Sequence, residues 1–230
     1  MGTETSQRIQ TSILNNLEKK ALIWLAERQP AWVTSDFLSY VGVAGAMLFV
    51  VFCALANNNI NWLWAAPLGL IINWYGDSLD GTLARVRQLQ RPKYGFFIDH
   101  SLDALTTCMI CVGIGCSPFM SMTVGLAILA GYLCMSIYTY LSTIILGEFR
   151  LTYGKLGPTE VRIIIIAVCI LYIFNPWKEV RIDILAHPFS IFDLIGLTVA
   201  AILFAIYIVS MVSDLRKLAR QDPPKPYRKP

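Results

Sequence analysis

The stretch that determines how this chain folds is residues 76–105, GDSLDGTLARVRQLQRPKYGFFIDHSLDAL. It places four aspartates at the ends of two apolar stretches: Asp77, Asp80, Asp99 and Asp103. A carboxylate at membrane depth costs roughly 2.5–3.5 kcal/mol on insertion scales, so an acid retained there marks a functional site with a specific partner. The rest of the sequence indicates whether these stretches lie in a membrane.

The composition predicts an all-α integral membrane protein. Of the 230 residues, 56% are hydrophobic and 15% are charged, and the mean hydropathy is +0.56. The apolar residues form blocks long enough to cross a bilayer, and spanning segments without an alternating barrel pattern must be helices. We expect a bundle of six transmembrane helices at residues 37–56, 61–78, 96–116, 119–146, 161–176 and 189–213. The fifth is short, and an extension into 177–182 would lengthen it.

The positive charges predict an orientation. One side of the membrane holds 17 of the 19 Lys and Arg residues if it carries the N-terminus, the 79–95 and 147–162 loops and the tail. By the positive-inside rule, both termini and the aspartate-bearing loop then face the cytoplasm. Because topology accounts for the net charge of +4, no nucleic-acid partner is expected. The predicted parts are a cytoplasmic amphipathic segment (1–33), the six-helix domain (34–214) and a disordered basic tail (215–230).

The segment before the first span has apolar residues at roughly helical spacing among charges, over residues 10–28. This pattern predicts an amphipathic helix lying on the cytoplasmic membrane face. A helix packed on cytoplasmic loops is the alternative.

Two further patterns leave structural choices open. Cys108 and Cys111 form a CxxC, but in the middle of an expected membrane helix, where small free thiols are favoured over a redox or zinc site. The small residues of GVAGAMLF, residues 42–49, could pack helices within one subunit or in a homodimer.

The four aspartates share two helical stripes with small residues: Asp77, Asp80, Gly81 and Ala84 in the first, and Gly95, Asp99 and Asp103 in the second. Two antiparallel helices facing each other through these stripes would bring the carboxylates together. The charges repel one another, and divalent cations would relieve the repulsion. Oxygen ligands suit Mg²⁺ or Mn²⁺, and two such ions can clamp a phosphoryl displacement. The pattern therefore favours a two-metal, phosphate-handling site.

A membrane cation transporter is the alternative, because intramembrane acids also build ion pathways. The small residues beside the acids favour the phosphate site, because they leave room for a bound ligand and an ion pathway does not require such room. Four basic residues lie in the intervening loop, where a diphosphate would approach: Arg85, Arg87, Arg91 and Lys93. They equally fit the positive-inside pattern.

The complete pattern resembles a family signature: Asp77-x2-Asp80-Gly81-x2-Ala84-Arg85, then Gly95-x3-Asp99-x3-Asp103. It is similar to that of the CDP-alcohol phosphotransferases, integral membrane enzymes that typically have a six-helix core. One residue more than usual separates the two halves, and it falls in the loop containing Pro92, where insertions are tolerated.

The resemblance implies transfer of a substituted phosphate from a CDP-linked alcohol to an acceptor alcohol, with release of CMP, in phospholipid biosynthesis. At least one of the two substrates would be a lipid. The metal ligands would be Asp77, Asp80 and Asp99, with Asp103 as a further ligand or the general base. The cytidine nucleotide would approach Gly81, Ala84 and Gly95, with Asp77 and Arg85 near it. A prokaryotic inner membrane is also expected, and since members of the family often form homodimers, a homodimer is one of the two options for residues 42–49.

The donor and the base stay open. His100 after Asp99, and Glu160 after Thr159, resemble segments of the choline and ethanolamine phosphotransferases, so His100 or Glu160 could replace Asp103 as the base. Members that use CDP-diacylglycerol need a cationic pocket when the acceptor is phosphorylated. That pocket could come from Arg150, Lys155 and Arg162, which could equally be topology-setting charges.

Overall fold

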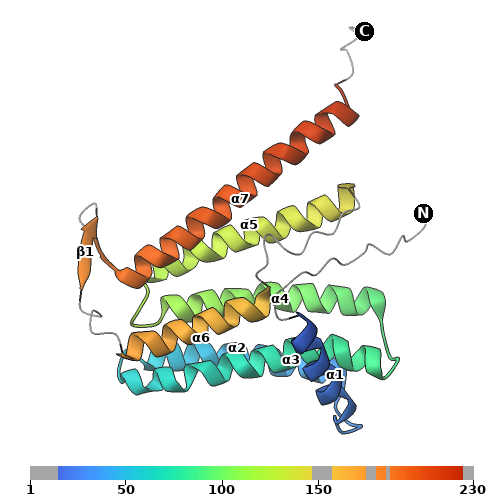
Figure 1. Ribbon diagram of the computed structural model, residues 1–230, viewed down its shortest axis with the longest axis horizontal. Coiled ribbons are helices and arrows are strands. Elements are labelled where there is room, and N and C mark those ends of the chain that lie inside the picture. Colours follow the sequence, from blue (N-terminus) through green and yellow to red (C-terminus); the bar gives the residue numbers. More distant parts are fainter. Residues whose placement is uncertain (1–14, 147–156, 175–179, 185–186, 225–230) are drawn as a thin grey trace.

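The computed structural model describes residues 15–146, 157–174, 180–184 and 187–224 (Figure 1). Within these ranges the chain forms seven α-helices, one 3₁₀ helix and a two-stranded hairpin. In chain order they are α1 (Asn15–Glu27), α2 (Ser35–Leu55), η1 (Ile60–Trp64), α3 (Ala66–Val86), α4 (Pro92–Gly115), α5 (Met122–Leu146), α6 (Pro158–Phe174), β1 (Arg181–Ile184), β2 (His187–Ser190) and α7 (Ile191–Gln221).

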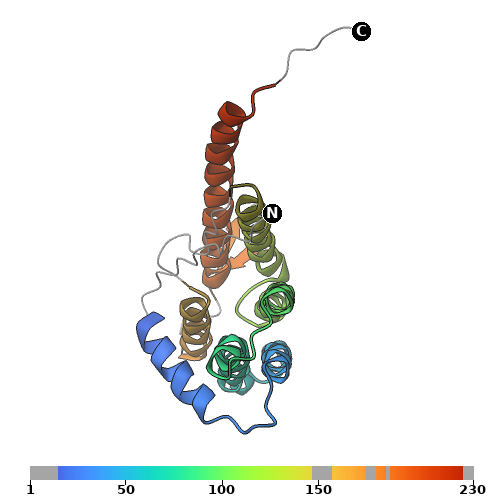
Figure 2. The ribbon, with the colours of Figure 1, turned by 90° about the vertical axis from the view of Figure 1, so that its right-hand side faces the viewer.

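The helices are arranged as a row of neighbours. Helix α2 packs against both α3 and α4, and α3 also contacts α6 and α1. Helix α5 packs against both α4 and α7. Figure 2, which views several of the helices nearly end-on, shows this order following a curve from α6 through α3, α2, α4 and α5 to α7. The two helices that carry the aspartates, α3 and α4, therefore both pack against α2.

Glycines bring α2 and α3 into backbone contact. A Cβ on Gly45 would lie 2.7 Å from the carbonyl oxygen of Gly69, and a Cβ on Gly69 would lie 2.8 Å from that of Gly45. Gly42 and Gly76 form a second contact of this kind. Small residues permit such close approach between membrane helices. The glycines of residues 42–49 thus pack within the chain, and this contact gives no support to the predicted homodimer.

The outer faces of the helices identify an integral membrane protein. Within the described ranges, α2, α4, α5 and α7 are long and apolar enough to cross a membrane. Large apolar side chains cover their surfaces: Ile144 is 79% exposed, Phe97 73% and Val209 68%. Soluble monomers rarely expose large contiguous apolar surfaces, whereas lipid covers them in a membrane protein.

The predicted count of six spans is only partly supported. Helices α3 and α6 form where spans were expected, but they do not meet the same length and composition criteria. Helix α3 contains two aspartates and an arginine, and α6 has 17 residues, about 26 Å at 1.5 Å per residue. The suggested extension of the fifth span into 177–182 is wrong for residues 181–182, which belong to β1, whereas residues 177–179 lie outside the described residues.

Two other boundaries differ from the prediction. The helical protein contains a short hairpin, in which β1 pairs antiparallel with β2 and Ile184 lies opposite His187. Helix α7 continues to Gln221, so the first seven residues of the predicted disordered tail, 215–230, are helical. This segment is rich in Leu, Arg, Lys and Ala, which favour helix, and its last-turn arginine complements the helix dipole.

Helix α1 packs on the membrane bundle. Leu22 and Ala26 are buried against Leu79 and Leu83 of α3. Trp24, by contrast, is 54% exposed. A helix thus forms over Asn15–Glu27 of the predicted 10–28, residues 10–14 lie outside the described residues, and part of its apolar face contacts protein. Its location at the membrane surface stays a prediction.

Candidate functional site

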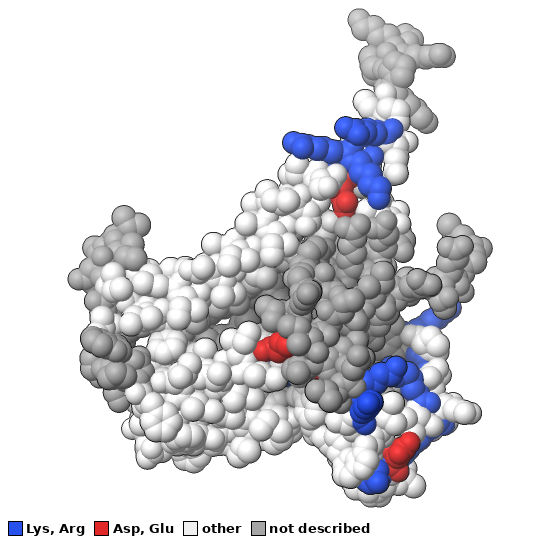
Figure 3. All heavy atoms as spheres, in the orientation of Figure 1, with Lys and Arg blue, Asp and Glu red and all other residues white. Residues whose placement is uncertain are grey.

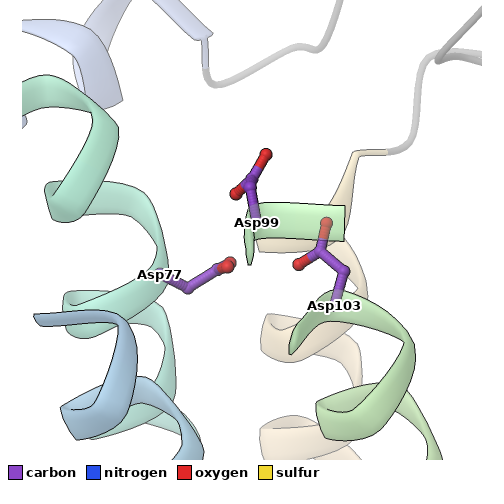
Figure 4. A group of neighbouring side chains, drawn as sticks. All are labelled: Asp77, Asp99 and Asp103. Carbon is purple, nitrogen blue, oxygen red and sulfur yellow. The ribbon is translucent and has the colours of Figure 1, made fainter. Parts of the chain in front are cut away.

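Three of the four aspartates converge at the interface between α3 and α4. Asp77 comes from α3, and Asp99 and Asp103 lie one turn apart on α4, so that all three side chains point toward a common space (Figure 4). One carboxylate oxygen from each residue lies within 4.8 Å of the other two. Two oxygens on opposite sides of one Mg²⁺ are about 4.2 Å apart. The spacing is therefore close to what a divalent cation requires.

Asp80 lies outside this group of three. Its Oδ2 accepts a 2.5 Å hydrogen bond from Ser39 Oγ of α2, and its Oδ1 accepts one from the backbone N–H of Gly81. It nevertheless lines the same small cavity, whose walls are Ser39, Gly42, Asn73, Asp77, Asp80, Asp99, Leu102 and Thr106. Asp80 is thus adjacent to the group, with both oxygens already hydrogen-bonded.

A buried arginine pairs with the cluster. Arg162 of α6 donates from Nη2 to Asp77 Oδ2 at 2.7 Å and from Nε to Asn73 Oδ1 at 2.9 Å. Asn73 in turn donates from Nδ2 to the carbonyl oxygen of Gly42 at 2.9 Å. Arg150 and Lys155, predicted to form a cationic pocket with Arg162, lie outside the described residues.

The glycines of the signature are not explained by helix packing. Among the described residues, nothing lies within 4 Å of a Cβ placed on Gly95. A Cβ on Gly81 would meet only the flexible guanidinium of Arg85, at 3.4 Å from Nη1. Arg85 also donates to Thr82 Oγ1 at 2.9 Å. Unlike Gly45 and the other glycines between α2 and α3, Gly81 and Gly95 border open space. Ala84 lies one turn beyond Asp80 on α3 and is half-buried.

The two other candidate bases have different surroundings. The His100 ring stacks on Phe96 with centroids 4.1 Å apart, and its Nδ1 lies 3.4 Å from Asp99 Oδ2. His100 is therefore adjacent to the cluster. Glu160 is buried at the start of α6, where its Oε2 accepts a 2.9 Å hydrogen bond from the backbone N–H of Gly157. That bond is the interaction expected of an acid in the first turn of a helix.

Two of the four basic residues, Arg87 and Arg91, hold distant parts of the chain together. Arg87 donates to the carbonyl oxygens of Gln29 and Pro30 at 2.9 and 2.8 Å, which fastens the chain after α1 to the end of α3. Arg91 donates from Nη2 to both carboxylate oxygens of Asp36. The hydrogen bond to Asp36 raises the pKa of the Arg91 guanidinium. Arg85 lies in the last turn of α3, beside Gly81, where it donates to Thr82.

Two residues of the site, Asn73 and Ser39, are not identified from the sequence, because their partners lie on other helices. Arg162 is predicted from the sequence as part of a cationic pocket or as a topology-setting charge, and not as the partner of Asp77. Asn73 lies four residues before Asp77, on the same face of α3, which is the available signal in the sequence. An arginine within an apolar run is a second signal, since buried charges in membranes pair with acids.

The fold and the three converging carboxylates define a helical membrane protein with a candidate divalent-cation site between its helices. The particular family follows from the sequence. The chain belongs to the CDP-alcohol phosphatidyltransferase family, whose sequence model matches residues 32–208.

Individual relatives fall into two kinds. The chain is 32% identical over 84 residues to phosphatidylinositol phosphate synthase of Cutibacterium acnes, covering 36% of this chain and 38% of that protein. It is 27% identical over 197 residues to cholinephosphotransferase 1 of Bos taurus, covering 78% of this chain and 46% of the relative. The human cholinephosphotransferase 1 matches at 26% over 186 residues, which cover 70% of this chain and 43% of the human protein. The chain thus spans less than half the length of these curated relatives.

Proposed function

We propose that this protein is a membrane phosphotransferase that moves a substituted phosphate from a CDP-linked alcohol to an acceptor alcohol and releases CMP. The convergence of Asp77, Asp99 and Asp103, all members of the family signature, is the observation that carries this proposal. The relatives' names connect both kinds of protein with phospholipid head groups, which supports a role in phospholipid biosynthesis.

The metal ions in this proposal are Mg²⁺ or Mn²⁺, in a pair. Their ligands are Asp77 and Asp99, with Asp103 as a further ligand or the base, and with Asp80 joining when its hydrogen bonds to Ser39 and Gly81 rearrange. Carboxylate oxygens are the donors that hard divalent cations prefer. Bound ions would neutralise the negative charge that develops on the leaving CMP.

The base in this proposal is Asp103. It is half-buried on α4, one turn from Asp99, within the group that would surround the reacting phosphate. Its carboxylate would accept the proton of the acceptor hydroxyl and orient that hydroxyl for attack. His100 beside Asp99 is the second candidate. Glu160 is the third, and its helix-capping hydrogen bond to Gly157 favours it least.

The nucleotide in this proposal occupies the open space beside Gly81 and Gly95, with Ala84 and Arg85 at its edge. The replacement Gly81→Ala tests this placement. A helical alanine in place of glycine should raise stability by roughly 0.5–1 kcal/mol, because no backbone atom opposes the new methyl group. The same methyl group would occupy ligand space, so we expect the KM for the CDP-linked donor to rise about tenfold or more. Thermal unfolding and donor titrations measure the two effects separately. An unchanged KM would exclude nucleotide contact at Gly81.

The donor and acceptor are identified by a substrate panel. Purified protein with Mg²⁺ or Mn²⁺ is incubated with CDP-diacylglycerol and soluble alcohols, or with CDP-choline or CDP-ethanolamine and diacylglycerol. We expect CMP release and a new phospholipid in one arm. Absence of CMP release in every arm, together with flux of the metal into protein-containing vesicles, would instead support the cation transporter.

The orientation follows from charge. In the view of Figure 3, Lys and Arg side chains gather over α1 and the C-terminal end of α7, whereas the described atoms at the opposite end are neutral. By the positive-inside rule, we propose that both termini and the site face the cytoplasm of a prokaryotic inner membrane, with α3 and α6 completing six crossings. A homodimer stays part of the proposal.

A further inference from the structure

The aspartate cluster has its own cation inside the fold. Three carboxylates whose oxygens lie within 4.8 Å of one another repel strongly, and burial strengthens the repulsion. Arg162 Nη2 lies 2.7 Å from Asp77 Oδ2, and the side chain is only 10% exposed. A guanidinium stays charged under all ordinary conditions, so this pair offsets part of the cluster's negative charge.

The guanidinium is held in place from a second direction. Its Nε donates to Asn73 Oδ1, and the fully buried Asn73 is itself fixed by a hydrogen bond to the backbone of Gly42 in α2. Helices α2, α3 and α6 thus jointly position Arg162. The arginine is therefore a built component of the site, and its orientation is set by the helix packing.

The bond to Asp77 is nevertheless made through one nitrogen. Arg162 Nη1 is buried and has no hydrogen-bond partner among the described residues. The strongest arginine–carboxylate pairs are bidentate, with two parallel hydrogen bonds. Here only one hydrogen bond joins Arg162 to Asp77. A competing cation can therefore bind the Asp77 carboxylate after that single bond is broken.

We propose that Arg162 is the counter-cation of the metal-free site and that it competes with the divalent cation for Asp77. This inference rests on the proposed metal site. In the absence of metal, the arginine stabilises the three carboxylates in their converged arrangement. When the metal binds, its positive charge repels that of the guanidinium. Each cation therefore weakens the binding of the other to Asp77. Such coupling is reciprocal and typically amounts to roughly 5–150-fold in affinity.

The test measures metal binding and stability in the absence of turnover. Full-length protein in detergent is stripped with EDTA, and Mn²⁺ binding is followed by the electron paramagnetic resonance of the free ion. We expect Arg162→Gln to bind Mn²⁺ roughly 5–150-fold more tightly than the wild type. In EDTA the same variant should unfold at a lower temperature, because the carboxylates have lost their counter-cation. Unchanged or weaker Mn²⁺ binding by Arg162→Gln would overturn the proposed competition. An arginine that only holds Asp77 in position would increase Mn²⁺ affinity, so its loss would weaken binding.

Two further variants strengthen the design. Arg162→Lys keeps the charge, but a single ammonium lacks the guanidinium's fixed fork, so it is held less well by both Asn73 and Asp77. Its Mn²⁺ affinity should fall between those of the wild type and Arg162→Gln, which tests the proposal even when the glutamine variant does not fold. Arg91→Gln removes an exposed arginine–aspartate pair with Asp36 and is the matched control, with Mn²⁺ affinity unchanged.

The outcomes separate this inference from the proposed function. Failure of the wild type to bind Mn²⁺ would overturn the metal site and the inference together. Mn²⁺ binding by the wild type, with no gain in Arg162→Gln or Arg162→Lys, would overturn only the role of Arg162.

Discussion

Asp103→Asn is expected to reduce CMP release by roughly 10²–10⁴-fold, the usual contribution of a positioned general base. Asparagine has nearly the same shape and removes one of three closely spaced negative charges, so the variant should stay folded and membrane-inserted. The measurements are CMP release from the active CDP-linked donor with Mg²⁺ or Mn²⁺, and thermal unfolding of the purified variant.

The control for this variant is Asp36→Asn. Asp36 pairs with Arg91 at an exposed position in the first turn of α2, and exposed ion pairs contribute about 0–1 kcal/mol. Its CMP release should stay close to that of the wild type. Mn²⁺ binding then separates the two roles of Asp103: loss of turnover with metal retained indicates the base, whereas loss of both indicates a ligand. Turnover that survives in Asp103→Asn would remove this residue as the base and direct attention to His100.

The convergence of the aspartates could be anticipated because helical spacing is a local property. Asp99 and Asp103 share a face of α4 at any helix orientation, and an antiparallel return of the chain brings Asp77 toward them. Asp80 has the same local spacing but a different environment. Its hydrogen bond from Ser39 depends on α2 lying beside α3, and no pattern within residues 76–105 specifies that neighbour.

Arg162 shows the same limit more clearly. In the sequence it follows a basic loop, and its charge fits the positive-inside pattern. In the structure α6 begins at Pro158, so Arg162 lies within the second turn of that helix and reaches Asp77 of α3. The contact between α6 and α3 joins residues 85 positions apart. Which helices become neighbours depends on packing across the whole bundle, and a single sequence indicates that poorly.

The boundaries of the helices were anticipated unevenly for a physical reason. An apolar run indicates which residues lie in the lipid. A helix ends where the backbone hydrogen bonds of the helix stop, and these can continue beyond the apolar run. Helix α7 therefore continues past the apolar run into the charged residues 215–221, which favour helix and border water. The hairpin before α7 is stabilised by contacts that the run does not encode: Ser190 caps α7 and donates to the carbonyl oxygen of Phe119.

The glycines between α2 and α3 predict the largest effect on folding. A methyl group at Gly76 would overlap the backbone of Gly42 and the carbonyl oxygen of Leu38, which cannot rotate away as a flexible side chain can. The helices must then separate, with loss of packing along α2 and α3. We expect Gly76→Ala to lower the free energy of unfolding by at least about 3 kcal/mol, the upper end for overpacked cores, and Gly76→Leu to yield no folded protein.

The measurement is thermal unfolding in detergent together with size-exclusion recovery, and Gly81→Ala is the matched control. Both changes add one methyl group to a helical glycine of α3, five residues apart. At Gly81 the methyl group meets open space and should stabilise, whereas at Gly76 it meets backbone. Separation of α2 from α3 would also displace Asp77 from Asp99 and Asp103, so surviving Gly76→Ala protein should bind Mn²⁺ weakly. A Gly76→Ala variant that unfolds at the wild-type temperature would contradict the backbone contact of α2 and α3. The position of Asp77 opposite the acids of α4 would then depend on its other contact, the pair with Arg162 of α6.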